Sequence, residues 1–597
     1  MKLNKKQKRA VQNTEDNLLV IAGPGSGKTL TLTKRFDKIV ERGADPEDIV
    51  LTTFGKKAAE EIKDRISVNE DEHSLNIGTI HALCRQIVRK EYEDTNYSSK
   101  PRVKSGYSRI KFAEDLMDDY IDEEYPTKKS GRSQLKQDLT DVALKNIDRQ
   151  RRFGNEPEDS EGSVEFLTPD DKRDISEFKK VKKIVENHLP DIYSDYMDEI
   201  YEENVLDFTQ MIYETNQIFS NNESTRKRYA SRYEYIMVDE AQDLNPMQWQ
   251  VIDHLAGGEK LCLVGDDAQT IYSWRGSDPT LLHRFKEQYD AQKIVYSKNY
   301  RSAQNIVDVV NKLNDGLEDA TPKMMVSGRG QVKEAENTPV VKQMSAEEVG
   351  ERVIQLVEEG YSPEDIGIIA RTNRLLYDYQ KAIEQMTIPT YNLGQNSFRE
   401  LWDVNKAYSY LRGSYKKDGR AMESILRDRN VYGIPSIKEA AEEEGKDLWQ
   451  FVEDLPTKND HIWKKKMRKV NRSMEFVDSL DEENPFQHLA ETKFKKKGLT
   501  GNVKALHRLY KTLGEKEFFE YMEMDRMENG VDMATVHQAK GKEWKVVFVV
   551  SVNDGTFPIE DHPEEKRNFY VACSRAEDKL FVTYDDEPSE FVNWVMG

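Results

Sequence analysis

The stretch AGPGSGKT at residues 22–29 follows a short apolar run, Leu18 to Ala22, and precedes a segment with helical spacing. Its glycines allow backbone N–H groups to point into a concave loop that holds phosphates at the N-terminus of a helix. In such a loop Lys28 reaches the β- and γ-phosphates, and the Thr29 hydroxyl is suited to ligate Mg²⁺. The stretch predicts a nucleotide-binding strand–loop–helix unit, with a glycine-rich turn that binds nothing as the alternative.

A second stretch, YIMVDEAQD at residues 235–243, supplies two adjacent carboxylates. Four apolar residues predict a buried strand, which places Asp239 and Glu240 at its carboxyl end, where ligands bind in open α/β sheets. Asp239 is suited to hold Mg²⁺ through water, and Glu240 to orient and deprotonate an attacking water. Alone, such a pair is usually a solvated turn. Together with the phosphate loop, it predicts hydrolysis of a nucleoside triphosphate.

The remaining strand signals predict the domain organisation. Short β-branched runs recur at residues 49–53, 261–264, 366–370, 546–550 and 580–584, each followed by a turn signal and a helical pattern. Strands that alternate with amphipathic helices indicate parallel sheets covered on both faces. Residues 90–204 and 398–521 lack the strand signal and show helical spacing instead. We therefore expect an α/β protein with two cores, each interrupted by a mostly helical insertion.

Composition limits the class of protein. The chain has 597 residues, with no apolar run near the roughly 18 residues of a membrane helix. The basic N-terminus MKLNKKQKR is not followed by the apolar core of a secretory signal. Three isolated cysteines, Cys84, Cys262 and Cys573, offer neither a disulfide framework nor zinc-ligand spacing. These features predict several domains, no membrane partner and a reducing cytoplasm, with association with the nucleoid if the source is bacterial.

The net charge and the local basic runs give opposite indications about nucleic-acid binding. Lys and Arg number 89 against 109 Asp and Glu, a net charge of −20, whereas phosphate binding favours positive charge. Net charge is a whole-chain sum, however, and binding depends on the local field in a groove. Basic runs at residues 464–469 and 493–497 fall in the second helical stretch. Such runs are as often solvated faces as binding surfaces.

Further motifs follow in a fixed order along the chain. They are LN with Gln7 (3–7), TTFGKKAA (52–59), GTIH (78–81), VGDDAQTIYSWRG (264–276), NYRS (299–302), ARTN (370–373), TVHQAKGKEW (535–544) and YVACSRA (570–576). In type and order this series resembles the UvrD/Rep/PcrA group of superfamily 1 helicases. The departures are Ala22 at the first loop position, Gly55 and Lys56 in the second motif, and Lys542 and Trp544 in the seventh.

The resemblance implies two RecA-like P-loop domains with parallel sheets. The expected first domain comprises residues 1–89 and 205–284, interrupted by a helical insertion at 90–204. The expected second domain comprises residues 285–397 and 522–597, interrupted by a helical insertion at 398–521 that is a candidate for contact with duplex DNA.

The resemblance also implies an ATP site. Arg301 and Arg575 are expected to reach the γ-phosphate, and Gln269 to sense it. Tyr300 is expected to stack on adenine beside Gln7 and Arg35, with Glu543 at the ribose. The expected ATP-binding set is Gln7, Ala22, Gly23, Pro24, Gly25, Ser26, Gly27, Lys28, Thr29, Arg35, Tyr300, Arg301, Glu543 and Arg575. The expected catalytic set is Lys28, Glu240, Gln269, Arg301 and Arg575, and the expected Mg²⁺ ligands are Thr29 and Asp239.

For the nucleic acid, the expected chemistry is stacking of bases on aromatic rings, which tolerates any sequence. The expected DNA-binding residues are Phe54, Thr79, His81, Tyr272, Trp274, Arg275, Arg371, Asn373, Phe398 and His537. Resemblance of IYSWRG and NYRS to the 3′–5′ subgroup predicts an ATP-dependent 3′–5′ translocase and DNA helicase acting on single strands and on junctions with duplex. The alternatives are a translocase that displaces proteins without processive unwinding, a non-catalytic DNA-binding scaffold, and a generic P-loop kinase.

Overall fold

A computed structural model gives the fold. It describes residues 3–68, 73–125, 132–160, 178–257, 260–330, 338–386, 388–393, 402–428, 441–442, 444–454 and 530–596, together with residues 438, 510, 519 and 522. These residues form two compact units, the first comprising 1–349, 365–378 and 535–597, and the second 350–364 and 379–534. Phe398 and the basic runs at 464–469 and 493–497 lie outside the described residues.

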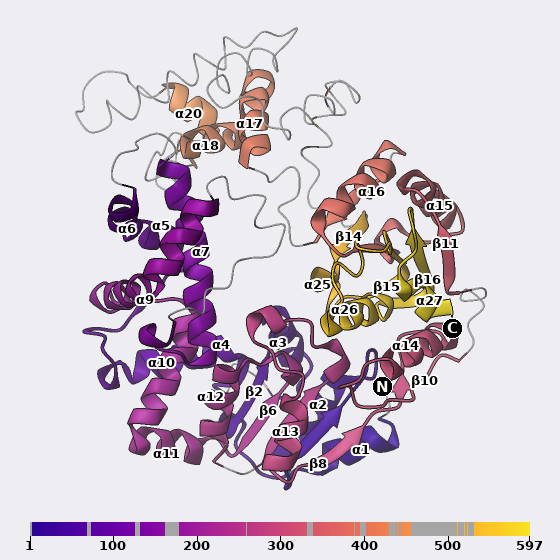
Figure 1. The fold of residues 1–597 in the computed structure, drawn as a ribbon, viewed down its shortest axis with the longest axis horizontal. Coiled ribbons are helices and arrows are strands. Elements are labelled where there is room, and N and C mark those ends of the chain that lie inside the picture. Colours follow the sequence, from indigo (N-terminus) through magenta and orange to yellow (C-terminus); the bar gives the residue numbers. More distant parts are fainter. Residues whose placement is uncertain are drawn as a thin grey trace. The chain divides into compact units, whose positions relative to one another are not determined.

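A six-stranded parallel sheet organises the N-terminal part of the first unit (Figure 1). Its order is β3-β2-β6-β7-β1-β8. The strands are β1 (Leu18–Ile21), β2 (Ile49–Thr53), β3 (Asn76–Thr79), β6 (Tyr235–Val238), β7 (Leu261–Gly265) and β8 (Gln292–Val295). The strands predicted at 18–22, 49–53, 235–238 and 261–264 are confirmed. Because all pairs are parallel, the segments that follow β1, β2, β6 and β7 meet at one edge of the sheet.

Helices cover this sheet and form the first insertion. Helix α12 packs on β6 and α13 on β1. The helices here are α1 (Lys5–Gln12), α2 (Lys28–Glu41), α3 (Lys56–Lys63), α4 (Ile80–Lys90), α5 (Tyr107–Glu114), α6 (Met117–Glu124), α7 (Arg132–Phe153), α9 (Phe178–Glu202), α10 (Phe208–Asn221), α11 (Glu223–Arg232), α12 (Pro246–Ala256) and α13 (Leu281–Gln288). Helices α5, α6, α7 and α9 lie within residues 90–204, so the described part of this stretch is mostly helical, as predicted. A short parallel pair joins β4 (Arg102–Val103) to β5 (Val205–Leu206).

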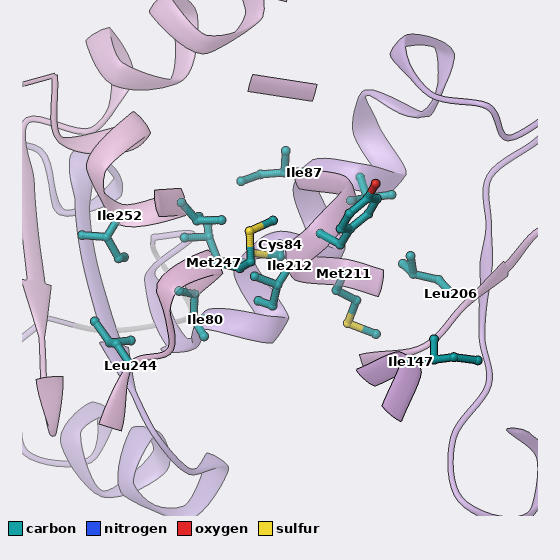
Figure 2. Close-up of a cluster of buried hydrophobic side chains, with 14 of the residues drawn as sticks. Ile80, Cys84, Ile87, Ile147, Leu206, Met211, Ile212, Leu244, Met247 and Ile252 are labelled. Carbon is teal, nitrogen blue, oxygen red and sulfur yellow. The ribbon is translucent and has the colours of Figure 1, made fainter. Parts of the chain in front are cut away.

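One apolar core connects the insertion with the helices beside the sheet (Figure 2). Ile80, Cys84 and Ile87 recur at helical spacing on one face of α4 and are buried. They share the cluster with Met211 of α10 and with Ile147 of α7. Full burial of one such side chain stabilises the fold by roughly 1.5–3 kcal/mol, so this shared core holds α4 and its N-terminus firmly.

A second parallel sheet occupies the C-terminal part of the first unit. Its strands there run in the order β11-β16-β15-β12. They are β11 (Val340–Gln343), β12 (Ile366–Ala370), β15 (Trp544–Val549) and β16 (Ala576–Tyr584), which confirms the strands predicted at 366–370, 546–550 and 580–584. A short parallel pair joins β9 (Lys298–Asn299) to β10 (Val326–Ser327). The helices are α14 (Gln304–Asp315), α25 (Val536–Ala539), α26 (Pro563–Cys573) and α27 (Glu590–Met596).

The second unit contains a strand pair and helices. Strands β13 (Thr390–Asn392) and β14 (Val531–Thr535) are parallel. Helices α17 (Trp402–Lys416), α18 (Gly419–Asp428) and α20 (Leu448–Asp454) belong to the second insertion, while α15 (Ala346–Glu358) and α16 (Asn373–Gln385) each begin in the first unit and continue in this one. No helix in the described part of the chain combines the length and the apolar composition needed to cross a bilayer. The protein is thus an α/β protein with two RecA-like parallel-sheet cores, and the described residues of its insertions are mostly helical.

Candidate functional site: a nucleotide pocket beside an aromatic surface

The phosphate loop lies between β1 and α2. Gly25 and Gly27 have positive φ angles of 63° and 80°, a conformation that glycine adopts without steric cost. A Cβ added at Gly25 would lie 2.5 Å from the Cβ of Arg301, and the Gly25 carbonyl accepts a hydrogen bond from the Tyr300 backbone N–H at 2.7 Å. Only glycine at this position allows the loop and the NYRS motif to approach so closely.

Lys28 and Glu240 form an ion pair at the centre of the pocket. The Lys28 ammonium donates to both carboxylate oxygens at 2.7 and 2.8 Å, and Gln242 donates to Oε2 at 2.8 Å. Burial alone would raise the pKa of Glu240, but attraction by Lys28 and Lys540 lowers this pKa to about 2. Glu240 has a φ of 50°, a sparsely populated conformation that often marks functional positions. The residue is therefore an ionised carboxylate held in a defined orientation.

Asp239 and Thr29 offer oxygen ligands of the kind that Mg²⁺ prefers. Asp239 is buried, and its Oδ1 accepts the backbone N–H of Glu240 at 3.0 Å. Burial and the neighbouring negative charge of Glu240 raise the pKa of Asp239 to about 7. Burial and repulsion disfavour the ionised form of Asp239, and a divalent cation would favour it. The oxygen ligands of Asp239 and Thr29 therefore fit Mg²⁺.

A cavity of about 390 Å³ surrounds these groups. Most of the expected ATP-binding residues line it. They are Gln7, Pro24, Gly25, Ser26, Gly27, Lys28, Thr29, Tyr300, Arg301, Glu543 and Arg575, together with the expected catalytic residues Glu240 and Gln269. The expected residues Ala22, Gly23 and Arg35 are not among the lining residues: the Arg35 guanidinium donates to the carbonyls of Ala10 and Asn13 at the end of α1.

Two arginines approach the pocket from the segment that carries the second sheet. Arg575 Nη2 donates to Gln269 Oε1 at 3.0 Å. Burial and repulsion by Arg301 lower the pKa of Arg575 to about 9, so the guanidinium stays charged at neutral pH but gains strongly from an anion. Arg301 pairs with Glu543, the residue expected at the ribose, through Nε and Oε2 at 2.6 Å.

An aromatic surface lies next to this pocket. The rings of Phe54 and Tyr272 are stacked, with centroids 5.4 Å apart and planes 10° apart. The Arg275 guanidinium lies over the rings of Tyr272 and Trp274 at 4.9 and 4.5 Å. Tyr272 is buried, whereas Phe54 is 48% and Trp274 56% exposed. Exposed rings anchored by a buried one, beside a cation, form a platform for stacking bases.

Two histidines border this surface. The ring of His537 lies 5.7 Å from that of Tyr272, and its Nε2 is 3.0 Å from the carbonyl of Ile271, so Nε2 donates its proton there. Burial and nearby arginines lower the pKa of His537, and likewise of His81, to about 4. Both imidazoles are neutral at pH 7. His81 also lines a cavity of about 460 Å³ together with Phe54, Trp274, Arg275 and Glu240.

Comparison with known proteins identifies the family of the chain. The UvrD/REP helicase N-terminal domain matches residues 3–290, and the UvrD-like helicase C-terminal domain matches residues 294–438 and 435–587. The chain belongs to the UvrD/Rep helicase family. It is an ATP-dependent DNA helicase, with ATP and DNA as its substrates.

Named relatives match nearly the whole chain. A probable DNA helicase II homolog of Mycoplasma capricolum is 26% identical over 98% of this chain and 84% of its own length. A putative ATP-dependent DNA helicase, YjcD, of Bacillus subtilis is 28% identical over 97% of this chain and 78% of its own. The ATP-dependent DNA helicase PcrA of Staphylococcus epidermidis is 26% identical over 97% and 83%. The similarity therefore includes the insertions as well as the two sheets.

The remaining predicted DNA-binding residues of this helicase lie in different settings. Thr79 caps α4, where its hydroxyl accepts the Ala82 N–H at 3.3 Å. Arg371 forms an ion pair with Glu565 at 2.7 Å. Asn373 is exposed at the start of α16. Of these three, Arg371 lies near the border of the aromatic surface, close enough to His537 to lower the pKa of its imidazole beyond the effect of burial.

The sequence motifs did not single out Lys540 as a functional residue, yet it occupies a central position in the helicase. Its ammonium donates to both oxygens of Asp243 and to the carbonyl of Gln269, all at 2.7 Å, and lies 4.8 Å from the ring centroid of Tyr272. Lys540 is in the TVHQAKGKEW motif, so its presence in a motif was the available signal. Its burial against an aspartate almost 300 positions away depends on tertiary packing and could not be predicted from the motif.

Proposed function

We propose that this helicase moves 3′ to 5′ along single-stranded DNA and opens duplex at single-strand junctions, driven by Mg-ATP. The observation that carries the coupling is the placement of Gln269, whereas the direction rests on the resemblance of IYSWRG and NYRS to the 3′–5′ subgroup. Its side chain meets Arg575 in the nucleotide pocket, and its carbonyl is held by Lys540, whose ammonium lies over the Tyr272 ring. A movement of Gln269 in the nucleotide pocket would therefore be transmitted through Lys540 to Tyr272 on the aromatic surface.

In the proposed mechanism, each of the two RecA-like domains supplies part of the catalytic site. Residues 1–89 and 205–284 supply Lys28 and Glu240, and residues 285–397 and 522–597 supply the two arginines. When the ammonium of Lys28 turns to a phosphate, Glu240 is released to accept a proton from water. Arg301 and Arg575 then stabilise the charge that develops during phosphoryl transfer. Closure and reopening of the site supply the step along the strand.

Thr29 and Asp239 are the proposed Mg²⁺ ligands. The metal, when bound, supplies positive charge at the phosphate oxygens. The raised pKa of Asp239 supports this assignment, because a cation favours the ionised carboxyl.

The direction and the unwinding are tested by strand displacement. Three duplexes are compared in Mg-ATP: one with a 3′ single-stranded tail, one with a 5′ tail and one blunt. We expect displacement of the 3′-tailed duplex alone. Displacement of the 5′-tailed duplex would contradict the polarity, and ATP hydrolysis on single strands that leaves every duplex intact would instead favour a translocase that does not unwind.

A further inference from the structure

A buried lysine lies behind the GDDAQ segment of the nucleotide pocket. The side chain of Lys323 is fully buried, and its ammonium donates to Asp266 Oδ1 at 2.6 Å and to Asp267 Oδ1 at 2.7 Å. Lys323 follows α14, outside every motif recognised in the sequence. Because a lysine is almost never fully buried without partners, this three-residue charge cluster is a built feature of the fold.

Asp266 connects the lysine to Gln269. Its Oδ2 accepts the side-chain N–H of Gln269 at 2.7 Å, inside the protein. This bond fixes which end of the amide faces the pocket, so that Gln269 Oε1 accepts from Arg575 at 3.0 Å. If the amide rotated, its NH₂ group would face the guanidinium, and two donors would meet without an acceptor.

Asp267 holds the lysine segment in place. Its Oδ2 accepts the backbone N–H of Thr321 at 2.8 Å and lies 3.6 Å from His283 Nε2. Burial would raise the pKa of Asp267, but hydrogen bonds from His283 and the charge of Lys323 hold it well below its usual range. The other groups that face the two carboxylates are Lys293 near Asp267, and Tyr570, Lys28 and Arg575 near Asp266.

We propose that Lys323 is a positioning residue for ATP hydrolysis: its ammonium holds the adjacent buried carboxylates of Asp266 and Asp267 in place, so that Asp266 can orient Gln269 toward Arg575. The inference rests on the proposed role of Gln269 at the γ-phosphate. Lys323 would thus act on ATP hydrolysis through Asp266 and Gln269, without contacting ATP or DNA itself.

The charge balance gives the proposal a pH signature. In Lys323→Met, the two neighbouring carboxylates lose their shared cation and repel each other, and the pKa of Asp267, which Lys323 lowers, rises. The repulsion moves the carboxylate of Asp266 and weakens its hydrogen bond to Gln269. Because a proton on Asp267 relieves the repulsion, the defect shrinks as the pH falls. Asp267→Asn in the same chain removes the same negative charge at every pH.

The test measures DNA-stimulated ATP hydrolysis for four proteins: native, K323M, D267N and K323M/D267N, between about pH 6.5 and pH 9. We expect K323M to lower kcat by about tenfold at pH 7, with KM for ATP within about threefold of native. Its kcat relative to native should recover as the pH decreases, because protonation of Asp267 has the same effect as Asp267→Asn. D267N should stay within about threefold of native, and the double variant should recover most of the loss. A H283N profile identifies any contribution from the exposed imidazole.

Other results overturn the proposal. A K323M defect that is constant with pH and persists in the double variant shows a purely structural role. If K323M does not fold, D266N decides, since it keeps Lys323 paired with Asp267: native kcat in D266N contradicts orientation of Gln269 by Asp266. Native protein without DNA stimulation refutes the proposed function itself, whereas stimulated native protein with an equally active K323M refutes only the role of Lys323.

Discussion

At the residue scale, the charged groups of the nucleotide pocket form ion pairs with one another. Lys28 neutralises Glu240, and Glu543 neutralises Arg301. The Lys28–Glu240 pair is largely shielded from solvent, where an unpaired charge would shift its pKa or disrupt the fold, whereas Glu543 is half-exposed. A substrate phosphate competes for both cations and leaves both carboxylates free.

Phe54→Ala tests the stacking surface. Removing the half-exposed ring that lies on Tyr272 should weaken binding of single-stranded DNA by about 1–3 kcal/mol, since a base loses its aromatic partner. Fluorescence anisotropy with a labelled oligonucleotide measures the change. Tyr377→Ala removes an aromatic ring that is 62% exposed elsewhere and should leave the affinity unaltered. Equal losses in both variants would contradict the assignment of the surface.

His537→Gln tests the buried imidazole through pH. The folded-state pKa of about 4 lies below the usual 6.5, so the unfolded chain binds the proton first as pH falls. His537 therefore costs stability progressively between pH 6.5 and 4, and this loss disappears in the variant. As the pH falls over this range, the Tm of the native protein should decrease relative to the Tm of His537→Gln. A constant Tm difference would show that His537 does not titrate there.

At the element scale, strands with β-branched runs were predictable and polar strands were not. β1, β2, β6 and β7 are buried and rich in β-branched or other apolar residues, whereas β3 contains Asn76 and Gly78 and β8 contains Gln292 and Lys293. The carboxyl-edge residues were predictable because parallel strands bring their ends together. The pairing of Arg371 with Glu565 and the contact of Arg35 with α1 were not, since both depend on how distant elements pack.

One departure from the family pattern also has a tertiary explanation. Trp544 is a larger side chain than the usual Phe, and it is buried at the start of β15. A Cβ added at Gly367 of the neighbouring β12 would lie 2.6 Å from the indole, so the missing side chain at Gly367 makes the room.

Arg151→Met tests how the first insertion is attached. Arg151 of α7 donates to Asp207, the cap of α10, at 2.9 Å, and both side chains are fully buried. The variant leaves a buried carboxylate with less compensation, so we expect a loss of about 3–5 kcal/mol in the free energy of unfolding. Urea denaturation measures it. Arg132→Met removes ion pairs to partly exposed aspartates and should cost less than about 1 kcal/mol. Comparable losses would contradict the account.

At the scale of the whole molecule, function depends on residues far apart in the chain. One pocket gathers Gln7, Lys28, Glu240, Arg301 and Arg575, and Lys540 connects it to the aromatic surface. A net charge of −20 does not oppose DNA binding, because cations such as Arg275 act locally at exposed rings. Strand binding and ATP hydrolysis are therefore expected to be coupled through this pocket.

The most direct test is the rate of ATP hydrolysis with and without single-stranded DNA, for the native chain, Glu240→Gln and the exposed control Glu287→Gln. We expect strong stimulation by DNA in the native and control proteins. Glu240→Gln should lose about 10²–10⁴-fold in kcat while still binding nucleotide, since only the proton acceptor is removed. Hydrolysis that is independent of DNA, or that survives Glu240→Gln, would contradict the account.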